Sequence, residues 1–236
     1  MTFRIRGIVL VLAVAVLLSL PAVSRAFRID DFSARGDTVS VTGVGTDGPS
    51  TVAGLDPNAV IGGSRTMFLE VIASVFSQNS EFSVDAAQQI LILNNGSGNR
   101  GTGVVTWDAN TSGLGGEDLT DNGASDRIAI HVLSSDLNTE IMVGITDTDG
   151  DSASNLTTLA TMMGIASLKF DDFVENGGGT TDFDSVDVIQ LTVARSPATA
   201  QDVTVRLVES SGGVPEPATM SLLGLGVIGF VRRRRA

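Results

Sequence analysis

The sequence predicts an all-β protein whose body is an antiparallel β-sandwich. Short apolar runs alternate with polar residues along the chain, and clusters of Gly, Asn, Asp and Ser separate these runs. Alternation with a period of two, in runs rich in Val, Ile, Thr and Phe, indicates strands with one buried and one wetted face. Helical periodicity is scarce: LTTLATMMG (156–164) fits a helical turn or a strand equally well.

Nine runs are each interpreted as one strand. In chain order they are TVSVTGV (38–44), MFLEVIASVF (67–76), QILILN (89–94), GVVTW (103–107), RIAIHVL (127–133), EIMVGITD (140–147), SLKFDDF (167–173), VDVIQLTVA (186–194) and DVTVRLVE (202–209). Nine or more strands in a body of this length favour two packed sheets, jelly-roll-like, over a barrel or a mixed fold. The glycine-rich stretch GVGTDG (43–48) is predicted to be a turn.

The first 26 residues have the pattern of a secretory signal peptide. Arg4 and Arg6 precede an apolar run over residues 7–20, and small residues stand at Ser24 and Ala26. This order predicts a signal helix that is cleaved after Ala26. The alternative, an uncleaved N-terminal anchor, usually needs about 17 to 25 apolar residues.

The predicted exported body, residues 27–213, is strongly acidic and has no cysteine. Its 8 Lys and Arg stand against 26 Asp and Glu, a formal charge of −18. Such a charge repels phosphate backbones and anionic lipid head groups, so nucleic acid and a charged membrane surface are poor partners. Without cysteine, thiol nucleophiles and thiolate metal sites are excluded, and the core alone must stabilise the domain.

An acidic turn is the candidate metal site. Asp147, Asp149 and Asp151 alternate in DTDGDS directly after a predicted strand, and such a set of carboxylates suits Ca²⁺, which takes six to eight oxygen ligands. The segment is not an EF-hand, because Ser152 and Thr158 stand where that loop needs Gly and Glu. The alternative is a solvated hairpin turn without metal.

A catalytic site is not predicted. A second acidic cluster could supply the carboxylate pair of a glycosidase, but a solvated surface explains it as well; its members are Asp171, Asp172, Glu175, Asp182, Asp184 and Asp187. His131 is the only histidine and lies in mid-strand, and no GxSxG elbow is present. The body is therefore expected to be non-enzymatic. Sugar binding would be favoured if Trp107, the only tryptophan, lay on an exposed sheet face.

The C-terminal residues 214–236 combine three ordered features: VPEP, the apolar run ATMSLLGLGVIGFV, and RRRRA. The apolar run of 14 residues would form a helix of about 21 Å, against a hydrocarbon core of about 30 Å. The basic residues Arg232, Arg233, Arg234 and Arg235 would stay on the cytoplasmic side. The segment is therefore expected to hold the chain in the membrane only transiently after export.

This C-terminus resembles the PEP-CTERM sorting signal of Gram-negative bacteria. The resemblance implies that Val214, Pro215, Glu216 and Pro217 are recognised by an exosortase, a membrane protease-transpeptidase that cleaves near the motif. It also implies an association with extracellular polysaccharide, which members' hosts tend to make. The alternative is a plain C-terminal tail anchor.

The body itself shows a slighter resemblance to galactose-binding-like jelly rolls, among them some carbohydrate-binding modules. It rests on RIDDFS (28–33) followed by IGGSR (61–65). It implies a fold and carries over no ligand residue. We therefore expect an exported surface or matrix protein with a transiently membrane-inserted precursor. The alternatives are a carbohydrate-binding module and a secreted glycosidase.

Overall fold

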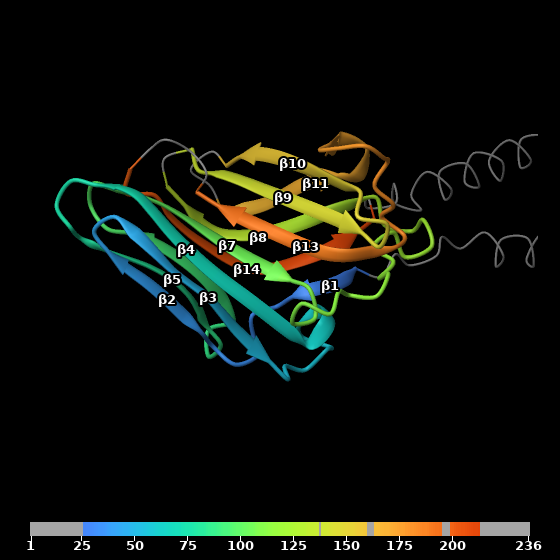
Figure 1. Cartoon of the computed structure of the whole chain (residues 1–236), viewed down its shortest axis with the longest axis horizontal. Coiled ribbons are helices and arrows are strands. Elements are labelled where there is room, and N and C mark those ends of the chain that lie inside the picture. Colours follow the sequence, from blue (N-terminus) through green and yellow to red (C-terminus); the bar gives the residue numbers. More distant parts are fainter. Residues whose placement is uncertain (1–25, 137, 160–162, 195–198, 213–236) are drawn as a thin grey trace, which may run out of the picture. The chain divides into compact units, whose positions relative to one another are not determined.

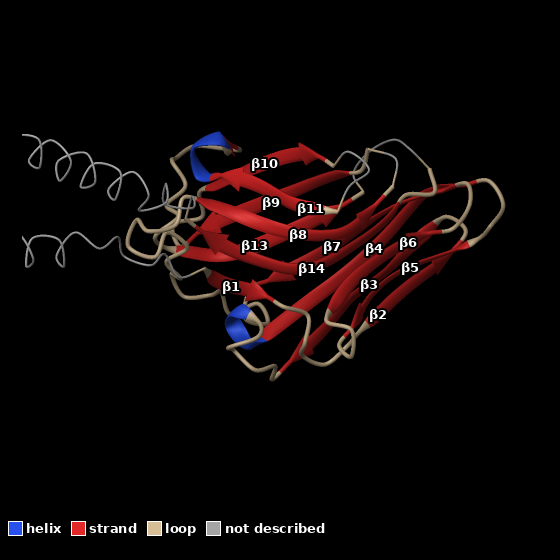
Figure 2. Ribbon diagram, turned by 180° about the vertical axis from the view of Figure 1, so that it is seen from behind, coloured by secondary structure: helices blue, strands red, loops and turns tan. Residues whose placement is uncertain are grey.

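The computed structural model describes residues 26–136, 138–159, 163–194 and 199–212, which form one two-layered body (Figure 1). The predicted signal helix, C-terminal helix and sorting motif lie outside the described residues, as does Arg195. Within the described part, all regular structure is strand except two single-turn 3₁₀ helices, η1 (Ile61–Gly63) and η2 (Phe170–Asp172). The prediction of an all-β antiparallel sandwich is confirmed (Figure 2).

The first sheet has the strand order β11-β8-β14-β6-β5-β2, with β1 paired to β14. All of its neighbouring strands are antiparallel. Its strands are β1 (Phe27–Asp30), β2 (Thr38–Thr42), β5 (Asn79–Asp85), β6 (Ile90–Asn95), β8 (Arg127–Ser135), β11 (Gly164–Lys169) and β14 (Asp202–Ser211).

The second sheet has the order β12-β10-β9-β13-β7-β4-β3 and is also antiparallel throughout. Its strands are β3 (Gly45–Ala53), β4 (Ser64–Ser74), β7 (Asn99–Trp107), β9 (Glu140–Asp147), β10 (Ser152–Thr158), β12 (Val174–Glu175) and β13 (Val186–Val193).

The core lies between the two sheets and is filled by alternate residues of each strand. The pattern of β9 is typical: Ile141, Val143 and Ile145 are buried, while Met142 and Gly144 between them face outward. Burying an aliphatic side chain of this size contributes roughly 1.5–3 kcal/mol, so a core of this extent can stabilise a domain that has no disulfide. The period-two pattern thus predicted both the strands and their buried face.

Each of the nine predicted strands overlaps an observed one, and two local predictions are wrong. GVGTDG (43–48) is not only a turn, because β3 begins at Gly45 and pairs with β4. SLKFDDF (167–173) is strand only to Lys169, and Phe170–Asp172 form η2 instead. The ambiguous segment 156–164 continues β10 as far as Thr158.

The body begins and ends at the same place. In β1 and β14, Phe27 lies opposite Ser210, so the chain enters and leaves the sandwich side by side. The loop between β4 and β5 lies at the far end of the strands (Figure 1). Whatever precedes Phe27 and follows Gly212 is therefore attached to one end of the body.

Candidate ligand-binding face

Two neighbouring rows on the outer surface of the second sheet carry no charged side chain, and Glu70 and Glu140 lie in the next row of that surface. Cross-strand neighbours form one polar row over six strands, in the order Ser154 (β10), Gly144 (β9), Gln190 (β13), Thr106 (β7), Thr66 (β4) and Thr51 (β3). At about 4.8 Å between neighbouring strands, this row spans roughly 24 Å. We call this row and the row beside it the neutral face.

The second row of the neutral face is mainly apolar. Its members, again in cross-strand order, are Leu156 (β10), Met142 (β9), Thr192 (β13), Val104 (β7) and Phe68 (β4). Leu156 is 48% exposed, and Phe68 is half-buried. Hydroxyl and amide groups therefore run parallel to a strip of carbon surface.

A hollow of about 450 Å³ lies on this face over β9, β10 and β13. Gly144 lines it, and a Cβ atom placed on Gly144 would come no closer to a neighbour than 3.9 Å, at Gln190 Cβ. Ser154 and Asn176 line another side and are joined by a hydrogen bond of 3.2 Å from Ser154 Oγ to Asn176 Oδ1. The hollow exists because glycine leaves the middle of a polar row empty.

The groups on the neutral face have unused hydrogen-bonding capacity. Gln190 Nε2 donates one long bond of 3.4 Å to Thr106 Oγ1, and the hydroxyls of Thr51 and Thr66 lie 3.0 Å apart. An amide offers two donors and an acceptor, and each hydroxyl offers a donor and an acceptor. Alternating donors and acceptors beside an apolar strip match a neutral, polyhydroxylated chain, which presents hydroxyl edges and C–H faces.

Trp107, by contrast, takes no part in any exposed face. It is fully buried between the sheets, and its Nε1 donates a hydrogen bond of 2.9 Å to Asp30 Oδ2. An exposed Trp107 would have favoured sugar binding, and the structure does not show one.

The neutral face could not be predicted from the sequence. The period-two pattern indicates which residues of a strand face outward, but it does not indicate the cross-strand register that places Gly144 beside Gln190.

The predicted calcium residues lie in the turn between β9 and β10, but the carboxylate of Asp147 is engaged within the fold. Asp147 Oδ1 accepts the backbone N–H groups of Asp149 and Asp151 at 3.0 Å each, and Asp147 Oδ2 accepts that of Asp182 at 2.9 Å. These donors, Asp182 above all, lower the pKa of the Asp147 carboxyl. Asp151 itself packs closely on Gly179, where any side chain would collide with its carboxylate.

Within the described ranges, no three His, Asp or Glu side chains come together as a group that could hold a metal ion. The geometry therefore lends the calcium prediction for Asp147, Asp149 and Asp151 no support, and calcium binding stays a prediction. The sequence did locate a turn, and its first carboxylate, that of Asp147, accepts hydrogen bonds from backbone N–H groups of the turn itself and of Asp182.

The second acidic cluster is divided among separate loops. Glu175 accepts hydrogen bonds from the backbone and hydroxyl of Thr181, Asp184 accepts one from Thr120 Oγ1, and Asp187 accepts the Gly115 N–H at 3.0 Å. Asp171 and Asp184 line a hollow of about 560 Å³ that also contains the side chain of Lys169. These contacts organise loops, and they provide no positive evidence for catalysis.

His131 lies within β8, as predicted, and its side chain is on the outer face of that strand. Its Nε2 is 3.0 Å from Glu209 Oε1 on the neighbouring strand β14. Both side chains are partly exposed, with 32% and 19% of their surface accessible. The pair is a cross-strand contact on the surface of the first sheet.

Comparison with known protein families identifies a sorting motif at the C-terminus. Residues 213–235 match the PEP-CTERM protein-sorting motif, so the chain carries this motif at the position that the sequence predicted. No curated protein sequence matches the chain. In the described part, no helix is long and apolar enough to cross a membrane.

Solved structures with a similar body include two carbohydrate-binding modules from Clostridium thermocellum. The family 11 module of the cellulosomal cellulase Lic26A-Cel5E has 12% identity and a TM-score of 0.42, with 83% of this chain and 99% of the module covered. The family 30 module of Cel9D-Cel44B has 12% identity and a TM-score of 0.39, with 82% and 100% covered. Likeness at this level assigns no ligand to this chain.

Proposed function

We propose that this protein is an exported, non-enzymatic component of the bacterial cell surface or extracellular matrix, which its neutral face attaches to polysaccharide. The PEP-CTERM motif at residues 213–235 supports the export and sorting part. In this proposal the signal peptide is removed after Ala26, with Ser24 and Ala26 at the cleavage site. An exosortase then recognises residues 214–217 while the apolar segment and the arginines at 232–235 hold the precursor in the membrane.

In this proposal the two processing events take place at neighbouring ends of the body. Phe27 and Ser210 are paired neighbours, so the proposed cleavage after Ala26 and the sorting signal beyond Gly212 act at one end of the sandwich. Neither event needs any strand of the second sheet to move.

One observation supports the polysaccharide part: an uncharged face with a hollow, on a body of net charge −18. Binding sites combine shaped apolar surface with a few polar groups, and unpaired charges that must be desolvated weaken binding. A neutral glycan that binds over Gly144 and Gln190 would not have to desolvate a charged side chain there. An anionic polymer would be repelled by the rest of the body.

Intact-mass measurement of the mature protein, isolated from the producing cells, tests the sorting part. The expected mass starts at Phe27 and ends near the motif at 214–217. A mature chain that retains Ala236 at its final location would exclude processing by an exosortase.

A glycan array with the mature protein tests the polysaccharide part. We expect binding to neutral polysaccharides, and more than about tenfold weaker binding when Gly144→Leu fills the hollow. The matched control is Gly164→Leu on the first sheet, where an added Cβ meets nothing within 4 Å. Equal binding by both variants would remove the neutral face from the proposal and leave the sorting part intact.

A further inference from the structure

Apart from β1, a strand of four residues whose Asp30 forms a bridge with Val60, four strands lie at the edges of the two sheets, and three of these edges are blunted. Natural sheets protect their edges with charges, prolines, bulges or covering segments, because an open edge pairs with other chains. On β2, the Ser40 N–H donates to Asp47 Oδ2 of β3 at 2.7 Å. The edge strand β3 contains Pro49 and a register shift between Asp47 and Ser50. The edge strand β12 is only two residues long.

The fourth edge, β11, has none of these devices before its last residue, Lys169. It pairs with β8 over all six residues without a register shift, from Gly164 opposite Val132 to Lys169 opposite Arg127. The segment 164–168 contains no charge and no proline. Among the described residues, no strand pairs with its other side.

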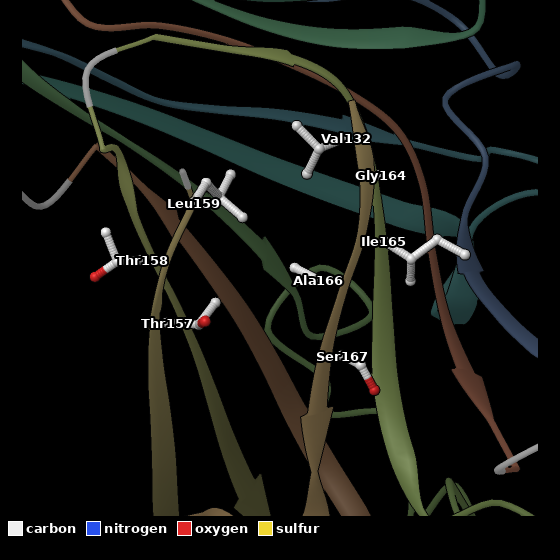
Figure 3. A pocket seen from close by; sticks show the side chains of 8 residues that line it. All are labelled: Val132, Thr157, Thr158, Leu159, Gly164, Ile165, Ala166 and Ser167. Atoms are coloured by element: carbon white, nitrogen blue, oxygen red, sulfur yellow. The ribbon is translucent and has the colours of Figure 1, made fainter. Parts of the chain in front are cut away.

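The opposite sheet does not cover this edge. A hollow of about 340 Å³ separates β11 from the end of β10, as Figure 3 shows. Leu159 and Ala166, both partly buried, line it from the two sides. On the outer face of the same strand, Ile165 is 61% exposed. Within the described part of the chain, this edge therefore combines backbone groups that pair with no strand and apolar side chains on both faces, Ala166 toward the core and Ile165 outside.

We propose that β11 pairs antiparallel with β11 of a second copy of this chain, so that the first sheet continues from one subunit into the other. A two-fold axis makes such a contact self-complementary, because each hydrogen bond occurs twice. The charge distribution favours a second copy at this position. Two bodies of charge −18 repel each other unless they meet where acidic side chains are absent, and residues 164–168 provide such a segment.

The register follows from the same argument. With Ala166 on the two-fold axis, the segment 164–168 pairs with itself, and Lys169 and Asp171 stay outside the paired segment. In this register, each residue lies opposite a residue of the partner strand whose side chain points to the same face of the sheet, as antiparallel pairing requires. Ile165 of one copy meets Ser167 of the partner on the outer face, and the two Ala166 residues meet over the core.

Sedimentation velocity of the full chain in mild detergent, over a range of concentrations, tests the pairing. The wild type is expected to show a concentration-dependent dimer that Ile165→Lys abolishes, because the edge then carries a positive charge. Ile72→Lys is the matched control: Ile72 is 48% exposed on the second sheet, and this variant should dimerise like the wild type. A wild type that stays monomeric, or an Ile165→Lys variant that dimerises normally, would overturn the proposal.

Charge complementation tests the register and separates lost pairing from lost folding. Ser167→Glu alone should also be monomeric, whereas a mixture of Ile165→Lys and Ser167→Glu should form mixed dimers, because the introduced ammonium of one chain then faces the introduced carboxylate of the other. Hydrogen exchange gives a second readout: exchange of the β11 amides should slow with concentration in the wild type and in the mixture only. A mixture that remains monomeric would contradict this pairing.

Discussion

Asp30 and Arg65 form a fully buried ion pair that joins the two sheets. Arg65 Nη1 lies 2.7 Å from Asp30 Oδ2, and neither side chain has accessible surface. Asp30 belongs to β1 of the first sheet and Arg65 to β4 of the second. The Phe32 N–H and Trp107 Nε1 also donate to the carboxylate, so its charge is held by three donors from three segments.

We predict that the two members of this pair stabilise the fold together, so that the costs of removing them are not additive. Asp30→Ala leaves the Arg65 guanidinium buried without its carboxylate, which typically costs about 3–5 kcal/mol of unfolding free energy. The double variant Asp30→Ala, Arg65→Met removes both charges, so its loss should be smaller than the sum of the single losses. Urea unfolding followed by circular dichroism measures each value.

The control for this prediction is the exposed pair of Arg28 and Asp31, whose Nη1 and Oδ2 lie 2.6 Å apart. Half of the Arg28 side chain is accessible, so Arg28→Ala should cost less than about 1 kcal/mol. Additive losses for Asp30 and Arg65 would show that the two residues stabilise the fold independently.

Much of the fold could be predicted because apolar and polar residues alternate along a strand of a sandwich, and the apolar ones indicate its buried face. EIMVGITD predicted β9 with the observed bounds. Among the strands that were missed, β3 (GTDGPSTVA) lacks this signal, because it has few apolar residues and its position at the edge requires none. Alternation reports burial, so it fails where a strand buries little.

The sites were less predictable, because they depend on which strands become neighbours. RIDDFS and IGGSR were noticed as separate pieces, and only the fold brings Asp30 and Arg65 together between the sheets. In the same way, Gly144 becomes the floor of a hollow only beside Ser154 and Gln190. The acidic turn was found as a motif, but its backbone donors, including that of Asp182, could not be read from local sequence.

Asp147 is predicted to stabilise the β9–β10 turn whether or not calcium is present. Asp147→Ala leaves three backbone N–H groups without their acceptor, so it should lower the melting temperature equally in calcium and in a chelator. Asp149→Ala should have little effect without calcium. Differential scanning calorimetry also decides the calcium prediction: it is abandoned if millimolar calcium leaves the melting temperature of the wild type unchanged.

Three carboxyls are predicted to make the unfolding free energy fall in acid. Hydrogen bonds lower the pKa of three carboxyls below the usual 3.8: the Asn58 backbone acts on Asp56, the Gln88 side chain on Asp85 and the Asp182 backbone on Asp147. A carboxyl with a depressed pKa stabilises the fold above its unfolded value, and this stabilisation is lost as the pH falls through its lower folded value.

Asp202 should oppose this trend at milder pH. Burial raises the pKa of its carboxyl, and the charge of Asp136 adds to the rise. Protonation of Asp202 therefore favours the folded state as the pH falls toward 3.8. Urea unfolding between about pH 3 and pH 8 should show a flattened acid limb in Asp147→Asn and a smaller gain at mild acidity in Asp202→Asn. Curves that coincide with the wild type would refute these assignments.

Gly103 is predicted to be intolerant of any side chain, because the Phe82 ring occupies the space above it. Gly103 lies on β7 of the second sheet and Phe82 on β5 of the first, and a Cβ on Gly103 would come within 2.8–2.9 Å of three ring atoms. Forcing a methyl group into a packed core costs typically about 1–3 kcal/mol, so Gly103→Ala should destabilise the body by this amount.

The contrast with the neutral face makes this prediction specific. Gly144→Ala adds the same methyl group on the outer side of β9, where the space is open, and should be neutral or stabilising by a few tenths of a kcal/mol. Phe82→Leu should relieve part of the cost of Gly103→Ala, since a smaller side chain leaves room for the methyl group. If Phe82→Leu and Gly103→Ala are simply additive in urea unfolding, the ring is not what excludes a side chain at Gly103.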